Sequence, residues 1–518
     1  MRRSALAATA LLALAPLLAG CLSGDGDKEG ADEPLPAALA CLGGVCNFEA
    51  TVEPEARQGN EVSIAVDPTD PLNMIASAKD YTPEQAGDCV WDGLYVTHDG
   101  GRTWANGNLP DSNWKRLADA QAGNPDPNPP ATEFSAYWCA TDPVVAFGPD
   151  GTAYWAVMPY QCDRLSGSKT GRGVLPDGGF NDWFWTCSSM YVLASDDAGD
   201  TWARIRQVAF GPRLEHDKMW LSVSDDNVAL LCWDRDPSYQ AASLAPGENP
   251  AAQLSPTAVI SCSTSRDRGD TWAPETDANP DWTGYFPWVD WDGDGRAWMA
   301  ALDGQNVLVT RSNDGLQWAA PVTVGQYQDP EPGGEYGWPV LEGSDFRTFA
   351  LPSLAVDRSG GPWDGTVYVA WFDHSSGNGE IMLAYSRDGG QTWSAPKRVH
   401  DDDPARGADQ FMPAVSVGPD GTVDVTFYDR RADPANHLFD LWYTYSVDGG
   451  ESFAPNLRVS EVSSDEQYSH HQNGMVFLGD YIDLDSSDGK AHAAWVDTRN
   501  QQADVFVATV ARPSANEL

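Results

Sequence analysis

The chain has 518 residues, of which 76 are acidic and 32 are basic, and its formal net charge at pH 7 is −44. A protein this acidic repels nucleic acids and anionic membrane surfaces, so we expect neither as a direct partner.

The N-terminus predicts an export signal. Arg2 and Arg3 precede an apolar run from Leu6 to Leu18, which is too short to span a bilayer comfortably and ends in small residues. The sequence Leu18-Ala19-Gly20-Cys21 resembles a lipobox, which implies cleavage before Cys21, lipid on its sulfur and a location at the outer face of the cell membrane. The alternative is an ordinary signal peptide followed by a chance cysteine.

These features divide the chain into a signal peptide at 1–20, an acidic tether at 21–47, a folded domain at 48–511 and a tail at 512–518. Beyond Cys21 eight cysteines remain, and an even number in an exported chain favours disulfides. The predicted pairs, which leave Cys89 and Cys139, are Cys41 with Cys46, Cys162 with Cys187, and Cys232 with Cys262.

A short signature, Ser/Thr-x-Asp-x-Gly-x-Thr-Trp, recurs along the chain. Copies lie at 97–104, 195–202, 265–272, 386–393 and 446–453, and a copy one residue short lies at 312–318. The Asp can accept hydrogen bonds from backbone amides, the Gly tolerates positive φ, and the aromatic residue can anchor a hairpin in apolar surface. The signature resembles the Asp box of bacterial neuraminidases, and six copies indicate a repeat protein.

Around the boxes a second pattern repeats, in which an apolar strand, a Gly/Asp turn and a second apolar strand follow one another. Seven such units begin near Val62, Val144, Trp220, Trp288, Pro352, Pro413 and Tyr481. Short alternating strands repeated in this way predict an all-β fold, a β-propeller of seven four-stranded antiparallel blades, with six as the alternative. The last unit lacks a box and a fourth strand, which a segment near 48–52 would supply to close the ring.

The boxes, the all-β repeats and the lipobox together resemble the exported, sialidase-like BNR-repeat family over about residues 48–511. The resemblance implies a glycan-binding face opposite the Asp boxes and a carbohydrate or glycoprotein partner, with no required cofactor. Sialidases hold the substrate carboxylate with three arginines and use a Tyr paired with Glu as nucleophile and an Asp as acid/base. This chain departs from the sialidases in two ways. It lacks their Phe/Tyr-Arg-Ile-Pro motif, because Phe346-Arg347 lies too far from Pro352 to match, and sialidases have six blades.

The candidate site residues lie at strand ends and in loops on the predicted binding face. The catalytic candidates are Asp142, Asp373, Asp429, Asp497, Tyr428 and Tyr481. The candidates for substrate binding are Arg347, Arg430, Arg431, Arg499, His216 and His374. Arginine suits carboxylates, and inward-facing arginines on an acidic protein suggest an anionic ligand. The alternative is architectural: each Asp accepts backbone hydrogen bonds from the next blade and each Arg pairs with it.

The acids Asp290, Asp292 and Asp294, followed by Gly295, resemble a calcium-binding loop. The usual later Glu is absent, and Asp-Gly turns are common in acidic hairpins. Calcium is therefore the one candidate cofactor.

Two functions follow from these observations, and in both we expect a monomer that meets the membrane only through its lipid. The first is a surface glycosidase of sialidase-like or broader type, and the second is a non-catalytic propeller that binds a glycan or a protein. A third and weaker hypothesis, a metal-dependent hydrolase on a histidine-rich face, has no ligand motif to support it.

Overall fold

The structure is a computed structural model. It separates Met1–Ala40 from a compact unit, Cys41–Leu518. Within that unit it describes residues 44–51, 58–81, 90–109, 134, 137–162, 187–212, 215–236, 259–333, 337–472, 475–487 and 489–512. The predicted signal peptide, Cys21 and most of the tether lie outside the described residues.

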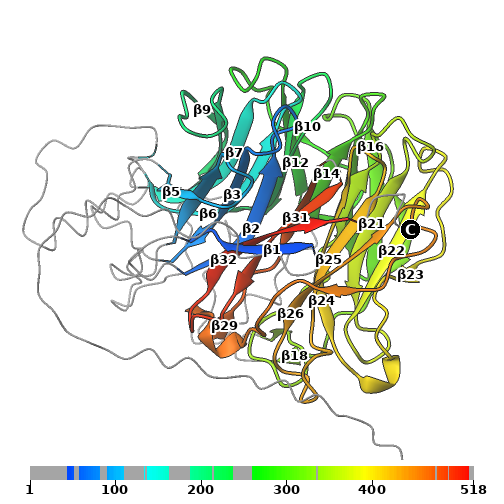
Figure 1. Ribbon diagram of the computed structural model, residues 1–518. Coiled ribbons are helices and arrows are strands. Elements are labelled where there is room, and N and C mark those ends of the chain that lie inside the picture. Colours follow the sequence, from blue (N-terminus) through cyan, green and yellow to red (C-terminus); the bar gives the residue numbers. More distant parts are fainter. Residues whose placement is uncertain are drawn as a thin grey trace, which may run out of the picture. The chain divides into compact units, whose positions relative to one another are not determined.

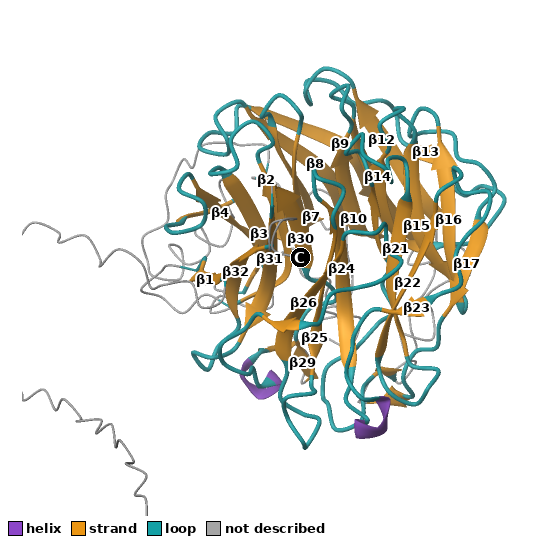
Figure 2. Cartoon of the chain, turned by 45° about the vertical axis from the view of Figure 1, so that its right-hand side comes forward, coloured by secondary structure: helices purple, strands orange, loops and turns teal. Residues whose placement is uncertain are grey.

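Seven four-stranded antiparallel sheets follow one another along the chain, which confirms the predicted seven-bladed β-propeller (Figures 1 and 2). Blade 1 consists of β2 (Gly59–Val66), β3 (Met74–Asp80), β4 (Trp91–Thr97) and β5 (Ala105–Asn108). Blade 2 consists of β6 (Tyr137–Phe147), β7 (Ala153–Cys162), β8 (Cys187–Ser195) and β9 (Arg204–Pro212). Blade 3 consists of β10 (Glu215–Val223), β11 (Ala229–Asp236), β12 (Val259–Ser265) and β13 (Thr276–Asp277). Blade 4 consists of β14 (Tyr285–Trp291), β15 (Ala297–Asp303), β16 (Asn306–Ser312) and β17 (Val322–Gln326). Blade 5 consists of β20 (Ser353–Val356), β21 (Val367–Asp373), β22 (Glu380–Ser386) and β23 (Lys397–Arg398). Blade 6 consists of β24 (Gln410–Val417), β25 (Val423–Asp429), β26 (Asp440–Ser446) and β27 (Leu457–Arg458).

Blade 7 joins the two ends of the folded unit. Its strands are β30 (Asp483–Ser487), β31 (Lys490–Asp497), β32 (Asp504–Ala511) and β1 (Val45–Glu49), and β1 pairs antiparallel with β32 from Val45 opposite Val510 to Glu49 opposite Phe506. In Figure 1 the blue β1 lies against the red β32. The predicted closing strand is therefore present, and it begins at Val45, upstream of the predicted boundary at residue 48.

The first strand of each blade is its inner strand. Each inner strand contacts the inner strands of both neighbouring blades, from β2 through β6, β10, β14, β20 and β24 to β30, which contacts β2 again. Side chains reinforce these contacts. The Ser63 hydroxyl accepts a hydrogen bond from the Val145 amide at 3.2 Å, and Asp483 accepts one from the Ile64 amide at 2.9 Å.

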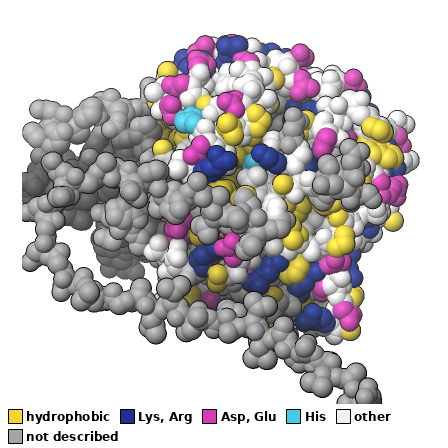
Figure 3. Space-filling view, in the orientation of Figure 1, with side chains coloured by type: hydrophobic (Ala, Val, Ile, Leu, Met, Phe, Trp, Pro, Cys, Tyr) yellow, Lys and Arg dark blue, Asp and Glu magenta, His cyan; other side chains and the backbone are white. Residues whose placement is uncertain are grey.

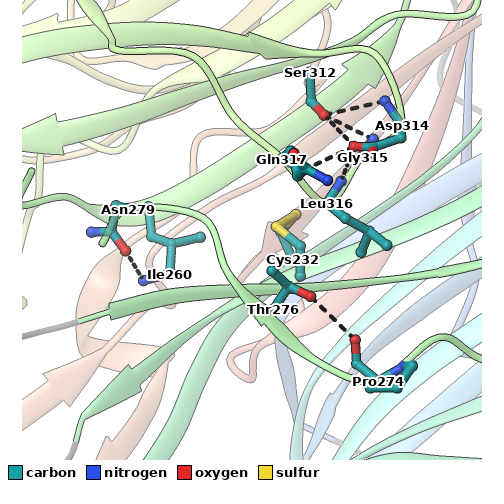
Figure 4. Close-up of a disulfide and its surroundings, with 11 residues drawn as sticks. Cys232, Ile260, Pro274, Thr276, Asn279, Ser312, Asp314, Gly315, Leu316 and Gln317 are labelled. Carbon is teal, nitrogen blue, oxygen red and sulfur yellow. Dashed lines mark hydrogen bonds between the residues drawn. A yellow bond between two sulfur atoms is a disulfide. The ribbon is translucent and has the colours of Figure 1, made fainter. Parts of the chain in front are cut away.

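Every Asp box connects the third and fourth strands of its blade, as the sequence predicts. In the first box, Asp99 accepts hydrogen bonds from the Thr103 amide at 2.9 Å and the Thr103 hydroxyl at 2.7 Å. In the short copy, Asp314 accepts from the amides of Leu316 and Gln317 instead, at 2.9 and 2.8 Å (Figure 4). The short copy therefore lacks the equivalent of the hydrogen bond from the Thr103 hydroxyl, but its Asp still accepts the amide hydrogen bonds that hold the turn.

The predicted disulfide between Cys232 and Cys262 is present and joins the neighbouring strands β11 and β12 (Figure 4). Cys46 and Cys139 are also disulfide-bonded. The predictions for Cys41, Cys89, Cys162 and Cys187 concern side chains that lie outside the described part of the chain.

On the coloured part of the face in Figure 3, basic side chains lie beside acidic ones. Among the described residues, no helix is long and apolar enough to cross a membrane.

Two buried hydrogen bonds join blades 6 and 7 through one side chain. The Tyr428 hydroxyl donates to the Val496 carbonyl at 3.0 Å and accepts from the Val496 amide at 2.9 Å. Burial raises the pKa of Tyr428 well above its usual value, so the hydroxyl keeps its proton. Tyr428, a candidate nucleophile from the sequence, here acts as a link between blades.

We predict that Tyr428→Phe lowers the free energy of unfolding by about 1–3 kcal/mol, because two backbone groups of Val496 lose their buried partner. Urea denaturation measures the change, and Tyr445→Phe, at a half-buried position on the neighbouring strand β26, is the matched control. Equal losses in the two variants would contradict the assignment.

Candidate functional site

Five inner strands carry a β-bulge at the same place, and the residue in each bulge has a positive φ. These residues are Glu61, Asp142, Lys218, Phe286 and Met412, with φ between 46° and 60°. Positive φ is uncommon outside glycine, and a bulge changes the direction in which a side chain points. Leu351 and Tyr481 stand at the equivalent position in blades 5 and 7, two residues before the first paired residue of the inner strand.

Six of these seven positions divide into a charged half and an apolar half, and the seventh is Tyr481 in blade 7. Blades 1 to 3 contribute Glu61, Asp142 and Lys218, whereas blades 4 to 6 contribute Phe286, Leu351 and Met412. All of these side chains are buried. Because repeats of one architecture carry different chemistry at the same position, this ring is a better site candidate than a feature found in every blade.

The charged half forms a compact ionic cluster. We call Glu61, Lys79, Asp142, Lys218, Arg347 and Asp480 the axial cluster. Lys79 contacts Glu61 and lies 2.7 Å from Asp142, while Lys218 lies 2.9 Å from Glu61 and 3.0 Å from Asp142. Two carboxyl groups and two lysine amino groups therefore alternate, and each carboxyl group contacts both lysines.

Asp480 extends the cluster toward blade 7. Its carboxylate lies 2.8 Å from the Lys218 nitrogen and accepts a hydrogen bond from Arg347 Nε at 2.7 Å. The Arg347 guanidinium lies 4.6 Å from the centre of the Phe477 ring, and Trp338 and Phe349 lie 5.4 and 5.3 Å from it. Arg347 thus meets the cluster on one side and aromatic rings on the others.

The cluster separates the pKa values of its carboxyl groups. Burial and the neighbouring Asp142 charge raise the pKa of Glu61 to about 8. Although burial opposes it, the ammonium groups of Lys218 and Lys79 hold the pKa of Asp142 well below its usual range. Arg347 and Lys218 likewise lower the pKa of Asp480. Near neutral pH, Glu61 therefore holds a proton while Asp142 and Asp480 are ionised.

Tyr481 adjoins the cluster. The Lys218 nitrogen lies 5.9 Å from the centre of its ring, and Trp220 packs edge-on against it at 5.8 Å. Burial and the charges of Asp142 and Glu61 raise the pKa of Tyr481 well above its usual value. Of the residues predicted from the sequence, the structure thus brings Asp142, Tyr481 and Arg347 together.

The acids at the ends of the second strands have local partners instead. Asp429 accepts hydrogen bonds from the Arg431 amide at 2.6 Å and from Arg431 Nε at 2.7 Å. Asp497 lies 2.8 Å from the Arg499 guanidinium in the same arrangement. Asp373 accepts from the Gln328 amide at 2.9 Å and the Ser375 hydroxyl at 2.6 Å. These contacts fit the architectural alternative for the Asp and Arg pairs.

The remaining binding candidates are also occupied within the fold. Arg430 is fully buried and contacts Glu466 at 3.1 Å. His216 is buried against the Ser188 hydroxyl at 3.0 Å, and burial lowers its pKa to about 4. The His374 ring stacks on Phe372, with the ring centres 6.4 Å apart. Among the described residues, no hydrogen bond or ion pair joins Arg430, His216 or His374 to the axial cluster.

The Arg296 side chain pairs with two acids of the predicted calcium loop. Asp292 accepts hydrogen bonds from the Arg296 amide and Arg296 Nε at 2.9 and 3.0 Å, and Asp294 also pairs with Arg296. Asp290 turns toward neighbouring blades, where it accepts from the Ser222 hydroxyl and the Val356 amide. No group of three or more metal-binding side chains occurs among the described residues. Calcium stays a prediction, and it would have to displace Arg296.

A cavity of about 560 Å³ lies among the later residues of the seven inner strands. Its walls include Val66, Phe147, Val223, Asp290 and Ser487. The axial cluster lies at the beginning of these strands, so the cavity and the cluster occupy opposite ends of the inner-strand ring.

Sequence reasoning missed Glu61, Lys79, Lys218 and Asp480. One signal was available in composition, because only seven of the 32 basic residues are lysines and two of them meet here. The other was the repeat itself. Asp142, Phe286, Leu351 and Met412 each precede a proline, and aligning blades 1 and 3 on that position selects Glu61 and Lys218.

Comparison with known proteins identifies the repeat. A family model described as BNR/Asp-box repeat matches residues 384–395, which contain the copy of the signature at 386–393. A search of curated proteins returned no match.

Solved structures similar to this chain include glycan-processing enzymes. The NanB sialidase of Streptococcus pneumoniae is 10% identical, with 92% of this chain and 95% of that chain covered and a TM-score of 0.40. An intramolecular trans-sialidase from Ruminococcus gnavus is 14% identical, with 91% and 98% covered and a TM-score of 0.37. An α-L-arabinofuranosidase from Fusarium graminearum is 14% identical, with 74% and 92% covered and a TM-score of 0.43. At these identities the likeness concerns the fold.

The raised pKa of Glu61 generates a pH prediction. The folded protein keeps a proton on Glu61 that the unfolded chain releases above its ordinary value of 4.5, so this group makes unfolding easier as pH rises from about 4.5 to about 8. In Glu61→Gln that dependence is absent. Between pH 5 and pH 8, the unfolding free energy of Glu61→Gln should therefore rise relative to that of the wild type. The difference between the two should grow by at most about 1.4 kcal/mol per pH unit.

Urea denaturation at both pH values measures this difference, with Glu275→Gln at an exposed position as control. Parallel pH profiles for wild type and Glu61→Gln would contradict the assignment.

Proposed function

We propose that this protein is a glycan-directed β-propeller that hydrolyses glycosidic bonds at the axial cluster. The observation that carries the proposal is the pairing of Glu61 and Asp142, two adjacent carboxyl groups whose pKa values shift in opposite directions. Glycosidases use one protonated and one ionised carboxyl group in this way, and separated pKa values identify the acid and its partner.

The roles follow from the protonation states. Glu61 holds a proton near neutral pH and is the general acid for the leaving-group oxygen, while ionised Asp142 stabilises or attacks the developing cation at the anomeric carbon. Because one Lys218 nitrogen contacts both groups, the carboxylates are close neighbours, which favours the short separation of retaining enzymes over the about 6.5–9.5 Å of inverting ones. Tyr481 keeps its proton, so we assign it as a hydrogen-bond donor to substrate.

The substrate class follows from the other groups in the cluster. Lys79, Lys218 and Arg347 place three cations beside the carboxyl pair, which favours an acidic glycan. Beside Arg347, the half-buried Trp338 offers an aromatic face on which a sugar can stack. We therefore propose that an anionic ligand binds at this cluster and not at Arg430, Arg431 and Arg499.

A second candidate function is that of a non-catalytic propeller that binds a glycan or a protein. The observation that favours it is that both lysines already contact Glu61 and Asp142, so neither carboxylate is free for a substrate in this arrangement. A buried ionic network of this kind also serves to fix neighbouring blades in one arrangement.

The two candidates are separated by hydrolysis assays on residues 41–518 with aryl glycosides, including acidic ones, in low and high salt. We expect release by wild type, and a loss of at least about 100-fold in kcat for Glu61→Gln and Asp142→Asn, because each removes one acid/base group. Asp270→Asn, at an exposed position on the Asp-box side, is the matched control and should keep full activity.

Release that survives Asp142→Asn would overturn the assignment of the site. No release from any glycoside, together with retained binding on a glycan array, would establish the binding function instead.

We also propose that the protein is exported and anchored through lipid on Cys21, as the lipobox-like sequence Leu18-Ala19-Gly20-Cys21 suggests. Expression in a bacterial host with a labelled fatty acid should label the wild-type chain, and Cys21→Ser should abolish the label because the acceptor sulfur is lost. Cys46→Ser, which leaves Cys21 in place, is the control. Equal labelling of wild type and Cys21→Ser would contradict the anchor.

A further inference from the structure

One connection between blades crosses to the axial cluster from elsewhere in the ring. We call residues 338–349, which lie between blades 4 and 5, the crossing segment. Its Phe346 forms an isolated parallel β-bridge with Val476, in the connection between blades 6 and 7. Phe346 is fully buried, so the two connections meet in a packed contact.

The crossing segment is anchored at Ser344 and Asp345. The buried Arg430 guanidinium donates hydrogen bonds to the Ser344 hydroxyl at 2.5 Å and to Glu466 Oε2 at 3.1 Å. The other Glu466 oxygen accepts from the Asp345 amide at 2.8 Å. Arg430 and Glu466 therefore attach the segment to blade 6 and to the connection that follows it.

Two residues beyond this anchor, Arg347 reaches the axial cluster. It pairs with Asp480, which also contacts Lys218, and it packs on Phe477, whose ring lies 5.2 Å from the Lys79 nitrogen. The Thr348 amide donates to the Pro339 carbonyl at 2.8 Å, which holds the two ends of the segment together.

Exposure shows where the cluster meets solvent. The side chains of Glu61 and Asp142 are at most 1% exposed, and Lys218 is 6% exposed. Arg347 is 23% exposed, and Asp217, 4.0 Å from Lys218, is 40% exposed. Arg347 of the crossing segment therefore lies between the buried Asp480 and solvent, and Asp217 is a second place where the cluster adjoins solvent.

We propose that the crossing segment is a gate over the axial cluster, with Arg430 and Glu466 as its anchor and the Arg347–Asp480 ion pair as its latch. Opening the latch moves Arg347 away from Asp480 and exposes Lys79 and Lys218. Arg430 and Glu466 are then positioning residues that set where Arg347 enters the site. The proposal rests on the proposed function only in taking the cluster as the place where substrate binds.

Lysine acetylation tests the gate without any activity assay. Residues 41–518 are treated briefly with sulfosuccinimidyl acetate, and the modified lysines are counted by peptide mass spectrometry. In wild type we expect Lys79 and Lys218 to react slowly and the surface residue Lys490 to react fast. In Arg347→Ala we expect Lys79 and Lys218 to react at least about tenfold faster, with Lys397 and Lys490 unchanged.

Arg499→Ala is the matched control, because it removes an arginine of a similar Asp–Arg pair in blade 7 and should leave Lys79 and Lys218 slow. Unchanged rates at both buried lysines in Arg347→Ala would overturn the gate.

If all lysines accelerate because Arg347→Ala fails to fold, Arg347→Lys replaces it. This variant keeps the charge but loses the two-point contact with Asp480, and it should still accelerate Lys79 and Lys218 measurably while Lys490 stays constant. No acceleration in that variant would also overturn the gate. If hydrolysis is absent while the gate behaves as expected, only the proposed function fails.

Discussion

The mutual neutralisation of charges at the axis is the constraint on which the rest of the site depends. A buried carboxylate or ammonium group is strongly unfavourable without a partner, and here Glu61, Asp142 and Lys218 are all buried. Each comes from a different blade, so their partners are found only when three blades are correctly placed. The same contacts that make burial tolerable also separate the pKa values of the two carboxyl groups, so stability and acid/base chemistry have one physical origin.

The contrast between repeated and unrepeated features separates architecture from site. Asp boxes recur in six blades and the Asp–Arg pairs at Asp429 and Asp497 in two, and each is complete within its own neighbourhood. The bulged position of the inner strand also recurs, but its residue changes from Glu to Asp to Lys and then to apolar side chains. A repeat protein can vary such a position without altering its blades, because the bulge and not the side chain serves the fold.

Most of the fold could be predicted because short segments of the sequence, the Asp boxes and the alternating apolar strands, determine it. The Asp boxes fixed the third and fourth strands, the missing box in the last unit indicated the closing strand, and Cys232 and Cys262 fell on neighbouring strands. The site could be predicted only in part, through Asp142, Tyr481 and Arg347. Glu61 and Lys218 face the axis because of register shifts within their strands, and a one-residue shift reverses the face on which a side chain lies. Arg347 enters from a connection whose path depends on contacts with Arg430 and Glu466, far away in sequence.

Closure of blade 7 by β1 has a consequence for how the chain folds. Val45 pairs with Val510, so the first described strand has its partner in the last described strand. Contacts of such large sequence separation make folding slow, because a long loop must close before they form. Until then the free edge of β1 and the matching edge of β32 are open to pairing with other chains.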